Sequence, residues 1–211
     1  MTKDTPRSPA AVSQPLPFKP AMIPSCDAFD FLLLPGLGNS GVDHWQSHWS
    51  MAFPNASRVL QDDWDTPQLP DWLARLDNAV AQGKRPAILI AHSLGVALAV
   101  HWLASREPGR VKAAFLVAPS DVESTDHTPD TIRNFAPLPR TRLPVPTITV
   151  ASSDDPFVTL ERACTFASDW GSAFHDAGAL GHLNGVSRLG LWPQGLVLLG
   201  RLLNRVSTTS D

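Results

Sequence analysis

Short apolar runs alternate with amphipathic segments along most of this chain, and this alternation limits the folds that it can adopt. Six runs are candidate strands, two of them short or weakly apolar: residues 29–34, 58–60, 87–91, 113–117, 147–151 and 172–175. Continuous apolar runs of this length are typical of strands that are buried on both faces, as in a parallel sheet.

Helical patterns lie between these runs. Apolar residues recur every three or four positions in residues 69–80, 94–105, 163–170 and 196–206, and Gly83 is suited to end the first of these helices. Alternating strands and helices imply right-handed crossovers and a doubly wound α/β fold. Ligands bind beyond the carboxyl ends of the strands in such sheets, so the residues directly after each strand are the first candidates for a site.

The length of 211 residues suits one domain with a terminal extension. Residues 1–26 hold six of the 20 prolines and show no hydrophobic period, which predicts a flexible extension. The start of this segment lacks the apolar stretch of a secretory signal. Residues 27–211 are expected to form the single domain.

Composition excludes several classes of function. The chain carries 17 basic and 20 acidic side chains, a net charge of −3, which argues against a general nucleic-acid-binding protein. No apolar run approaches the roughly 20 residues that span a bilayer, so no membrane partner is expected. Two cysteines cannot form a disulfide framework, which favours a reducing, cytoplasmic location. The oligomeric state stays open.

A candidate nucleophile follows the strand predicted at residues 87–91. This strand runs into Ala91-His92-Ser93-Leu94-Gly95, and a helical pattern comes next. Such a strand–turn–helix setting is that of the nucleophile elbow G-x-S-x-G, here with alanine in the first position. The turn holds the serine in a strained conformation, and small neighbours let the helix pass close to the strand. Ser93 is therefore the candidate, although a serine in an isolated motif of this kind more often only caps a helix.

A serine hydroxyl is a poor nucleophile unless a neighbouring base takes its proton. Seven histidines compete for this role. His182 lies in the loop between the last strand candidate and the final helix, which should open at the same sheet edge as Ser93. His92 flanks Ser93, but strand geometry is expected to point it away. His182 is therefore the predicted base.

The base needs a carboxylate that orients it. Asp154 and Asp155 follow the strand predicted at residues 147–151. Asp155 is favoured because it precedes a proline, which imposes an extended geometry; Asp154 is the second choice and Asp121 the third. The chain order serine, aspartate, histidine is that of α/β-hydrolases. Three residue types suited to one chemistry, at three strand ends, are hard to explain by chance.

Stabilising the oxyanion of such a reaction takes two N–H groups directed at the oxygen. The Leu94 amide, directly after the candidate nucleophile, is the first. A second donor is expected from the glycine-rich loop after the first strand, because glycine lets the backbone approach a substrate closely. Leu37 is the predicted donor in this loop, with Gly36 or Gly38 as open alternatives.

The same loop also permits a rival interpretation. Residues 36–41, GLGNSG, match the dinucleotide-binding motif G-x-G-x-x-G, and Asp62 and Asp63 lie about 20 residues further on. The bulky Trp45 then stands where the helix of such a fold must lie close to the sheet. This interpretation also leaves the serine, aspartate and histidine above unexplained, and it is disfavoured.

His44 and His48 are spaced as on a zinc-binding helix. Trp45 stands where that motif has its glutamate, so packing on a helix is the preferred interpretation. Neither a metal nor another cofactor is expected for this chain.

Several motifs together resemble the small α/β-hydrolases related to retinoblastoma-binding protein nine, over about residues 29–203. They comprise residues 34–36, 41–45, 49, 63–64, 91–95, 153–156, 181–184 and 192–195. The resemblance implies a three-layer α/β fold without a large cap domain, built on a mostly parallel six-stranded sheet. It also implies serine-hydrolase activity on small esters or amides, with Ser93, Asp155 and His182 as catalytic residues. The partner binding that names the family is not implied, since neither cysteine lies in an L-x-C-x-E motif.

The segments between the strands are too short for a large lid, and the longest, residues 121–143, is expected to shade the site. Trp45, Trp49, Trp64 and Trp192 are candidates for an aromatic pocket, with core packing expected for at least half of them. No arginine stands at a strand end to bind an anion, which favours a small, fairly neutral acyl substrate. The alternative function is that of a non-catalytic interaction protein on a hydrolase scaffold.

Overall fold

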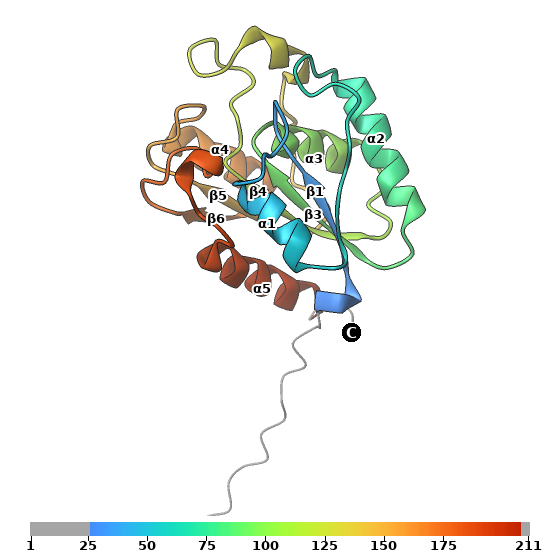
Figure 1. The fold of residues 1–211 in the computed structure, drawn as a ribbon. Helices are drawn as coiled ribbons and strands as arrows, with labels where there is room; N and C mark the ends of the chain where they lie inside the picture. Colours follow the sequence, from blue (N-terminus) through green and yellow to red (C-terminus); the bar gives the residue numbers. More distant parts are fainter. Residues whose placement is uncertain (1–25, 208–211) are drawn as a thin grey trace, which may run out of the picture.

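The computed structural model describes residues 26–207, and the extension predicted at residues 1–26 lies almost wholly outside them. Six parallel strands form one sheet in the order β2-β1-β3-β4-β5-β6 (Figure 1). The strands are β1 (Asp30–Leu34), β2 (Ala56–Arg58), β3 (Ala87–His92), β4 (Val111–Val117), β5 (Thr147–Ala151) and β6 (Ala173–Asp176). The expected parallel sheet is confirmed, and every pairing in it is parallel.

Five α-helices cover the two faces of this sheet. They are α1 (Trp45–Ala52), α2 (Leu69–Gln82), α3 (Leu94–Ser105), α4 (Leu160–Trp170) and α5 (Pro193–Ser207). Three short 3-10 helices complete the described chain: η1 (Cys26–Ala28), η2 (Asp130–Phe135) and η3 (Gly185–Ser187). None of the helices in residues 26–207 combines the length and the apolar composition of a membrane-spanning segment.

Alternation along each strand divides the core into two layers. On β1, Leu32 and Leu34 face the layer that contains α2, α3 and α4, whereas Phe31 and Leu33 face the layer that contains α1 and α5. All four side chains are almost completely buried. A strand covered on both faces must be apolar throughout, which is why these strands appear in the sequence as continuous apolar runs.

The strand boundaries agree with the sequence prediction to within two residues, and the difference matters most at β2. The short strand expected at residues 58–60 is formed instead by Ala56–Arg58. Val59 still donates its amide to the Leu33 carbonyl oxygen, but the chain then leaves the sheet and Leu60 is 67% exposed. Val59 and Leu60, the apolar residues that suggested the strand, therefore lie where the chain leaves the sheet and not within the strand.

The longest connection, between β4 and β5, forms part of the domain and no separate cap. Its helix η2 buries Ile132 and Phe135 in the core, and Leu138 and Leu143 are buried after it. Thr128 and Pro129 from the same connection line a cavity beyond the carboxyl ends of the strands. This segment therefore shades the sheet edge, as its length and position predicted.

Gln46 links the carboxyl ends of two central strands. Its side chain is fully buried, and its Nε2 donates to the carbonyl oxygens of Leu34 at 3.3 Å and Ile90 at 2.9 Å. Its Oε1 accepts from the Ser40 hydroxyl at 2.7 Å. A buried amide with its donors and acceptor satisfied fixes the neighbouring chain, and here it holds the loop after β1 against the end of β3.

The turn from β3 into α3 lies against the end of β1. A Cβ on Gly95 would collide with the carbonyl oxygens of Leu34 and Pro35. A Cβ on Gly36 would lie 2.6 Å from Cβ of Ser93. Two glycines, one on each segment, therefore permit the close contact of the first loop with this turn.

We expect Gly95→Ala to lower the free energy of unfolding by about 1–3 kcal/mol, because the added methyl group has only fixed backbone oxygens to displace. Gly200→Ala, in α5, is the matched control, since nothing lies within 4 Å of a Cβ at that position. The control should be neutral or stabilise by up to about 1 kcal/mol. Chemical denaturation of both variants measures the difference, and a Gly95→Ala protein as stable as wild type would contradict the packing described.

Candidate active site

Ser93 occupies the sharp turn between β3 and α3. Its backbone has φ 58° and ψ −125°, a conformation that costs energy for a residue with a side chain. The Ser93 amide donates to the Val117 carbonyl oxygen at 3.0 Å, which ties the turn to the end of β4. The turn and strained conformation predicted for this serine are both present.

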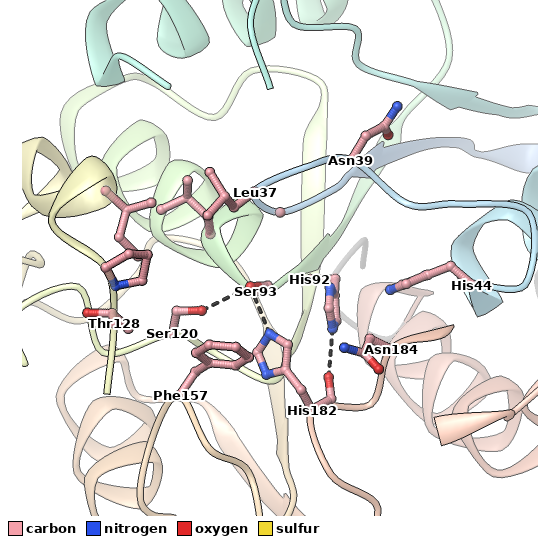
Figure 2. A pocket seen from close by; sticks show the side chains of 14 residues that line it. Leu37, Asn39, His44, His92, Ser93, Ser120, Thr128, Phe157, His182 and Asn184 are labelled. Carbon is pink, nitrogen blue, oxygen red and sulfur yellow. Dashed lines mark hydrogen bonds between the residues drawn. The ribbon is translucent and has the colours of Figure 1, made fainter. Parts of the chain in front are cut away.

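Ser93, His182 and Asp155 form a continuous chain of hydrogen bonds. His182 Nε2 lies 2.8 Å from Ser93 Oγ, and His182 Nδ1 lies 2.8 Å and 2.9 Å from the two carboxylate oxygens of Asp155 (Figure 2 shows the serine–histidine contact). The Asp155 side chain is fully buried and that of His182 is 7% exposed. Since a carboxylate only accepts, Nδ1 carries the proton and Nε2 presents its lone pair to the serine hydroxyl.

The two alternative aspartates have other partners. Asp154 Oδ1 accepts from the Gly181 amide at 2.7 Å and from the Ser152 hydroxyl at 2.8 Å. These hydrogen bonds, that of Ser152 first, hold the pKa of the Asp154 carboxyl below its usual value. Asp121 forms an ion pair with Arg162 at 3.0 Å. Asp154 therefore fixes the loop that precedes His182, and Asp155 alone contacts the imidazole.

Two further side chains hold the backbone of the His182 loop. His92 donates its Nε2 proton to the His182 carbonyl oxygen at 2.9 Å, and Trp45 Nε1 donates to the Leu183 carbonyl oxygen at 2.8 Å. Burial lowers the pKa of His92 well below its usual value, so this ring is neutral. His92 was expected to point away from Ser93, and its Nε2 is directed to the His182 carbonyl oxygen; its ring also lines the cavity that Ser93 lines and lies 4.9 Å from the His182 ring.

Ser120 is a site residue that the sequence interpretation missed. Its hydroxyl lies 2.9 Å from Ser93 Oγ, and the residue is 5% exposed. When Ser93 donates its only hydroxyl proton to His182 Nε2, its oxygen can only accept from Ser120, so Ser120 is the donor in the hydrogen bond between the two serines. The turn that presents it contains Ala118 at φ 49°, a strained conformation for a buried alanine. The signal was available, because Ser120 follows β4 by the same rule that suggested Asp121.

Both residues whose amides were predicted as oxyanion donors, Leu37 and Leu94, line this cavity. The Leu94 amide begins α3, where it has no intrahelical acceptor. The Gly38 amide is already bound to the Trp64 carbonyl oxygen at 2.9 Å, which removes Gly38 from the alternatives. Gly36 lies against Ser93 and stays an alternative.

The cavity beside Ser93 has a volume of about 210 Å³. Every residue that lines it lies at or after the carboxyl end of a strand: Gly36, Leu37, Asn39, His44, His92, Ser93, Leu94, Ser120, Thr128, Pro129, Ile132, Phe157, His182 and Asn184. No aspartate, glutamate, lysine or arginine of the described chain is among these lining residues. The cavity is therefore small, and among its lining residues only the histidines have side chains that can carry a charge.

The tryptophans do not form the aromatic pocket that was considered. Trp45, Trp49 and Trp192 are buried together in the core layer of α1 and α5, and Trp64 packs edge-to-face on Trp72. None of them lines the cavity within the described chain. Core packing, expected for at least half of these residues, applies to all four.

The rival interpretations of the first loop find no support. The strand order 2-1-3-4-5-6 differs from the order 3-2-1-4-5-6 of dinucleotide-binding folds. Asp62 pairs with Arg75, and Asp63 accepts from the amides of the turn that follows it. His44, the first residue of the zinc-like pair, caps α1 by accepting from the Gln46 amide.

Comparisons with known proteins agree with this arrangement. A YdeN-like hydrolase from Pectobacterium atrosepticum is 32% identical, with a TM-score of 0.77 over 85% of this chain and 93% of that one. The ydeN product of B. subtilis, 16% identical, has a TM-score of 0.62 over 86% and 99% of the two chains. An esterase domain from Rhodothermus marinus, 19% identical, has a TM-score of 0.59 over 84% and 87%. The two more distant structures share the fold.

A search of curated protein sequences gave no match. The family described as serine hydrolase matches residues 31–201, which span all six strands and most of α5. This chain, with its α/β-hydrolase fold, belongs to the serine hydrolase family.

Proposed function

We propose that this protein hydrolyses small ester or amide bonds through an acyl-enzyme on Ser93, with His182 as the base and Asp155 as its orienting carboxylate. The observation that carries the proposal is the unbroken chain of hydrogen bonds from Ser93 Oγ through the imidazole to a buried carboxylate. Membership of the serine hydrolase family supports it.

The arrangement accounts for the first half of the reaction. Ser93 Oγ forms a bond to the substrate carbonyl carbon while its proton passes to His182 Nε2. The electron pair of the carbonyl moves to its oxygen. When the tetrahedral intermediate collapses, the bond to the leaving group breaks and the leaving group takes the proton from Nε2. The Asp155 carboxylate stabilises the imidazolium that exists between these two transfers.

Two amides are proposed to stabilise the oxyanion. The Leu94 amide lies directly after the nucleophile, and the Leu37 amide belongs to the loop that Gly36 brings against Ser93. Donors already fixed by the backbone cost no reorganisation when charge develops on the oxygen. Water then forms a bond to the acyl carbon while His182 takes its proton; the bond from that carbon to Ser93 Oγ breaks, Oγ takes the proton back from Nε2, and the acid is released. No step requires a cofactor.

Some of the solved structures with this fold are described by their activity. One is an esterase domain and another a type II thioesterase, 19% and 20% identical to this chain. These descriptions apply to those proteins, and they fit the acyl-transfer chemistry that is proposed here. A cytoplasmic location is also proposed, which the two exposed free cysteines, Cys26 and Cys164, favour.

Ser93→Ala tests the nucleophile. We expect a fluorophosphonate probe to label the wild-type protein and to spare the variant, because the probe reacts only with an activated hydroxyl. Hydrolysis of short p-nitrophenyl esters should be lost together with labelling. Labelling that persists in the variant would remove Ser93 from this role, and a wild-type protein that neither reacts nor hydrolyses would favour the non-catalytic alternative.

Asp155→Asn and Asp154→Asn separate the two neighbouring carboxylates. The first change keeps the shape but places an N–H donor against His182, which turns the imidazole to the wrong tautomer; we expect kcat to fall by about 10³–10⁴-fold. Asp154→Asn keeps an oxygen that accepts from Gly181, so a loss below about tenfold is expected. Steady-state kinetics on one ester measures both, and the opposite ranking would reverse the assignment.

Ser120→Ala removes the hydroxyl beside the nucleophile. We expect kcat/KM and the rate of probe labelling to fall together by about 2–10-fold, the range of one neutral hydrogen bond. Ser120→Thr should restore most of the loss. Ser50→Ala, which removes a hydroxyl bonded only within α1, is the control. Unchanged labelling in the alanine variant would show that the Ser120 contact does not assist Ser93.

A further inference from the structure

The cavity has two chemically different halves, with Ser93 between them. Leu37 and Phe157 lie on one side of the serine together with Ser120 and Thr128, whose hydroxyls are bonded within the protein (Figure 2); Pro129 and Ile132 are further apolar lining residues, and we call this side the apolar half. Asn39, His44 and Asn184 lie on the other side of the serine (Figure 2); the Asn39 amide is turned away from Ser93, and the Oδ1 atoms of Asn39 and Asn184 already accept hydrogen bonds within the protein. A substrate whose carbonyl carbon sits at Ser93 would therefore extend into an apolar environment in one direction and a polar one in the other.

His44 has a defined tautomer. Its Nδ1 accepts from the Gln46 amide at 3.1 Å, so this nitrogen carries a lone pair. Burial, with smaller contributions from His182, Arg58 and His48, lowers the pKa of His44 to about 3, so the ring is neutral near pH 7. A neutral imidazole with its lone pair on Nδ1 has its proton on Nε2. His44 therefore offers one N–H donor on the edge away from α1.

This donor has no acceptor. Four buried side-chain polar atoms in residues 26–207 have no hydrogen-bond partner: His44 Nε2, Asn55 Oδ1, Gln61 Oε1 and Thr147 Oγ1. Only the first belongs to a residue that lines the cavity. Figure 2 shows the His44 ring directed toward His92, with which it packs edge-to-face at 4.6 Å. A buried donor without a partner costs stability, and an acceptor atom of a ligand in the cavity would satisfy it.

We propose that His44 Nε2–H binds a hydrogen-bond acceptor in the alcohol portion of the substrate, and that the substrates are neutral esters with a short apolar acyl group and an alcohol that carries a second oxygen. This inference rests on the proposed serine-hydrolase function. A carboxylate or phosphate is disfavoured as the acceptor, because no lysine or arginine of the described chain lines the cavity to balance a buried charge.

The polar half suits the leaving group for two reasons. Asn184 belongs to the loop of His182, the residue that must protonate the departing alcohol. Asn39, His44 and Asn184 also border a second, more open groove, which gives the alcohol a route to solvent and is lined further by Val42, Val186 and one side chain of each charge, Asp43 and Arg188. The apolar half belongs to the smaller cavity of about 210 Å³, which limits the acyl group to a few carbons.

Two isosteric esters test the proposal. n-Butyl butyrate and 2-methoxyethyl butyrate share the acyl group. Their alcohols differ only in that an ether oxygen of the second replaces one methylene group of the first. After correction for their rates of alkaline hydrolysis, we expect wild-type kcat/KM to favour the methoxyethyl ester by about 3–10-fold, the range of one hydrogen bond. Equal values for the two esters in the wild-type protein would overturn the proposal without any variant.

His44→Asn then identifies the donor. Asparagine is a strong N-cap whose oxygen can keep the contact with the Gln46 amide, but its side chain is too short to place an N–H at the Nε2 position. The ratio of corrected kcat/KM for the methoxyethyl ester to that for the butyl ester should fall to about one. His48→Asn, a change of the same type one turn along α1 and outside the cavity, should keep the wild-type preference.

A preference that survives in His44→Asn would assign it to another group and contradict the inference. Fluorophosphonate labelling separates this failure from a failure of the proposed function. A protein that is labelled and hydrolyses both esters equally retains its hydrolase function and loses only the role of His44. A protein that is not labelled and hydrolyses neither ester overturns both.

Discussion

Contact between the loop after β1 and the turn after β3 is the constraint on which the site depends. Gly36 leaves room for the Ser93 side chain, and Gly95 lets α3 begin against the carbonyl oxygens at the end of β1. Gln46 then bonds the ends of both strands and keeps the two segments together. Because the two glycines leave no room for a side chain in this contact, a Cβ added at Gly36 or Gly95 acts directly on the position of Ser93.

The loop that carries His182 is held by a different kind of interaction, namely side-chain hydrogen bonds to its backbone. The His182 loop receives side-chain hydrogen bonds at three consecutive positions: Asp154 accepts from the Gly181 amide, His92 donates to the His182 carbonyl oxygen, and Trp45 donates to that of Leu183. Asp154 follows β5, His92 is the last residue of β3, and Trp45 is the first residue of α1. An imidazole that must reach both a hydroxyl and a carboxylate is thus positioned by its own backbone as well as by its ring contacts.

Much of this arrangement could be predicted from the sequence. Continuous apolar runs identify the strands because parallel strands are buried on both faces, and the rule that sites follow strand ends brings Ser93, Asp155 and His182 to one edge. The boundary of β2 was missed because Val59 and Leu60 are apolar but stand where the chain leaves the sheet. A three-residue edge strand is fixed by its pairing with β1, which no local pattern records.

The contributions of His92 and His44 could not be predicted from the sequence for a related reason. Each depends on which way a side chain turns after a strand or at a helix start, and that direction is set by packing between segments distant in sequence. His92 was assigned by strand alternation, but the ring at the last strand position reaches the His182 loop. Tryptophans were ambiguous since a cavity wall and a core use the same aromatic residues; three of the four lie in one buried cluster.

The central claim is that the Ser93 hydroxyl becomes acylated during turnover because His182 and Asp155 take up its proton. Acid quenching of the protein while it hydrolyses a p-nitrophenyl ester, followed by peptide mass analysis, tests this claim most directly. We expect the mass of one acyl group on the peptide that contains Ser93, and its absence in Ser93→Ala. Steady hydrolysis with no acyl group on that peptide, or with the group on another residue, would contradict the account.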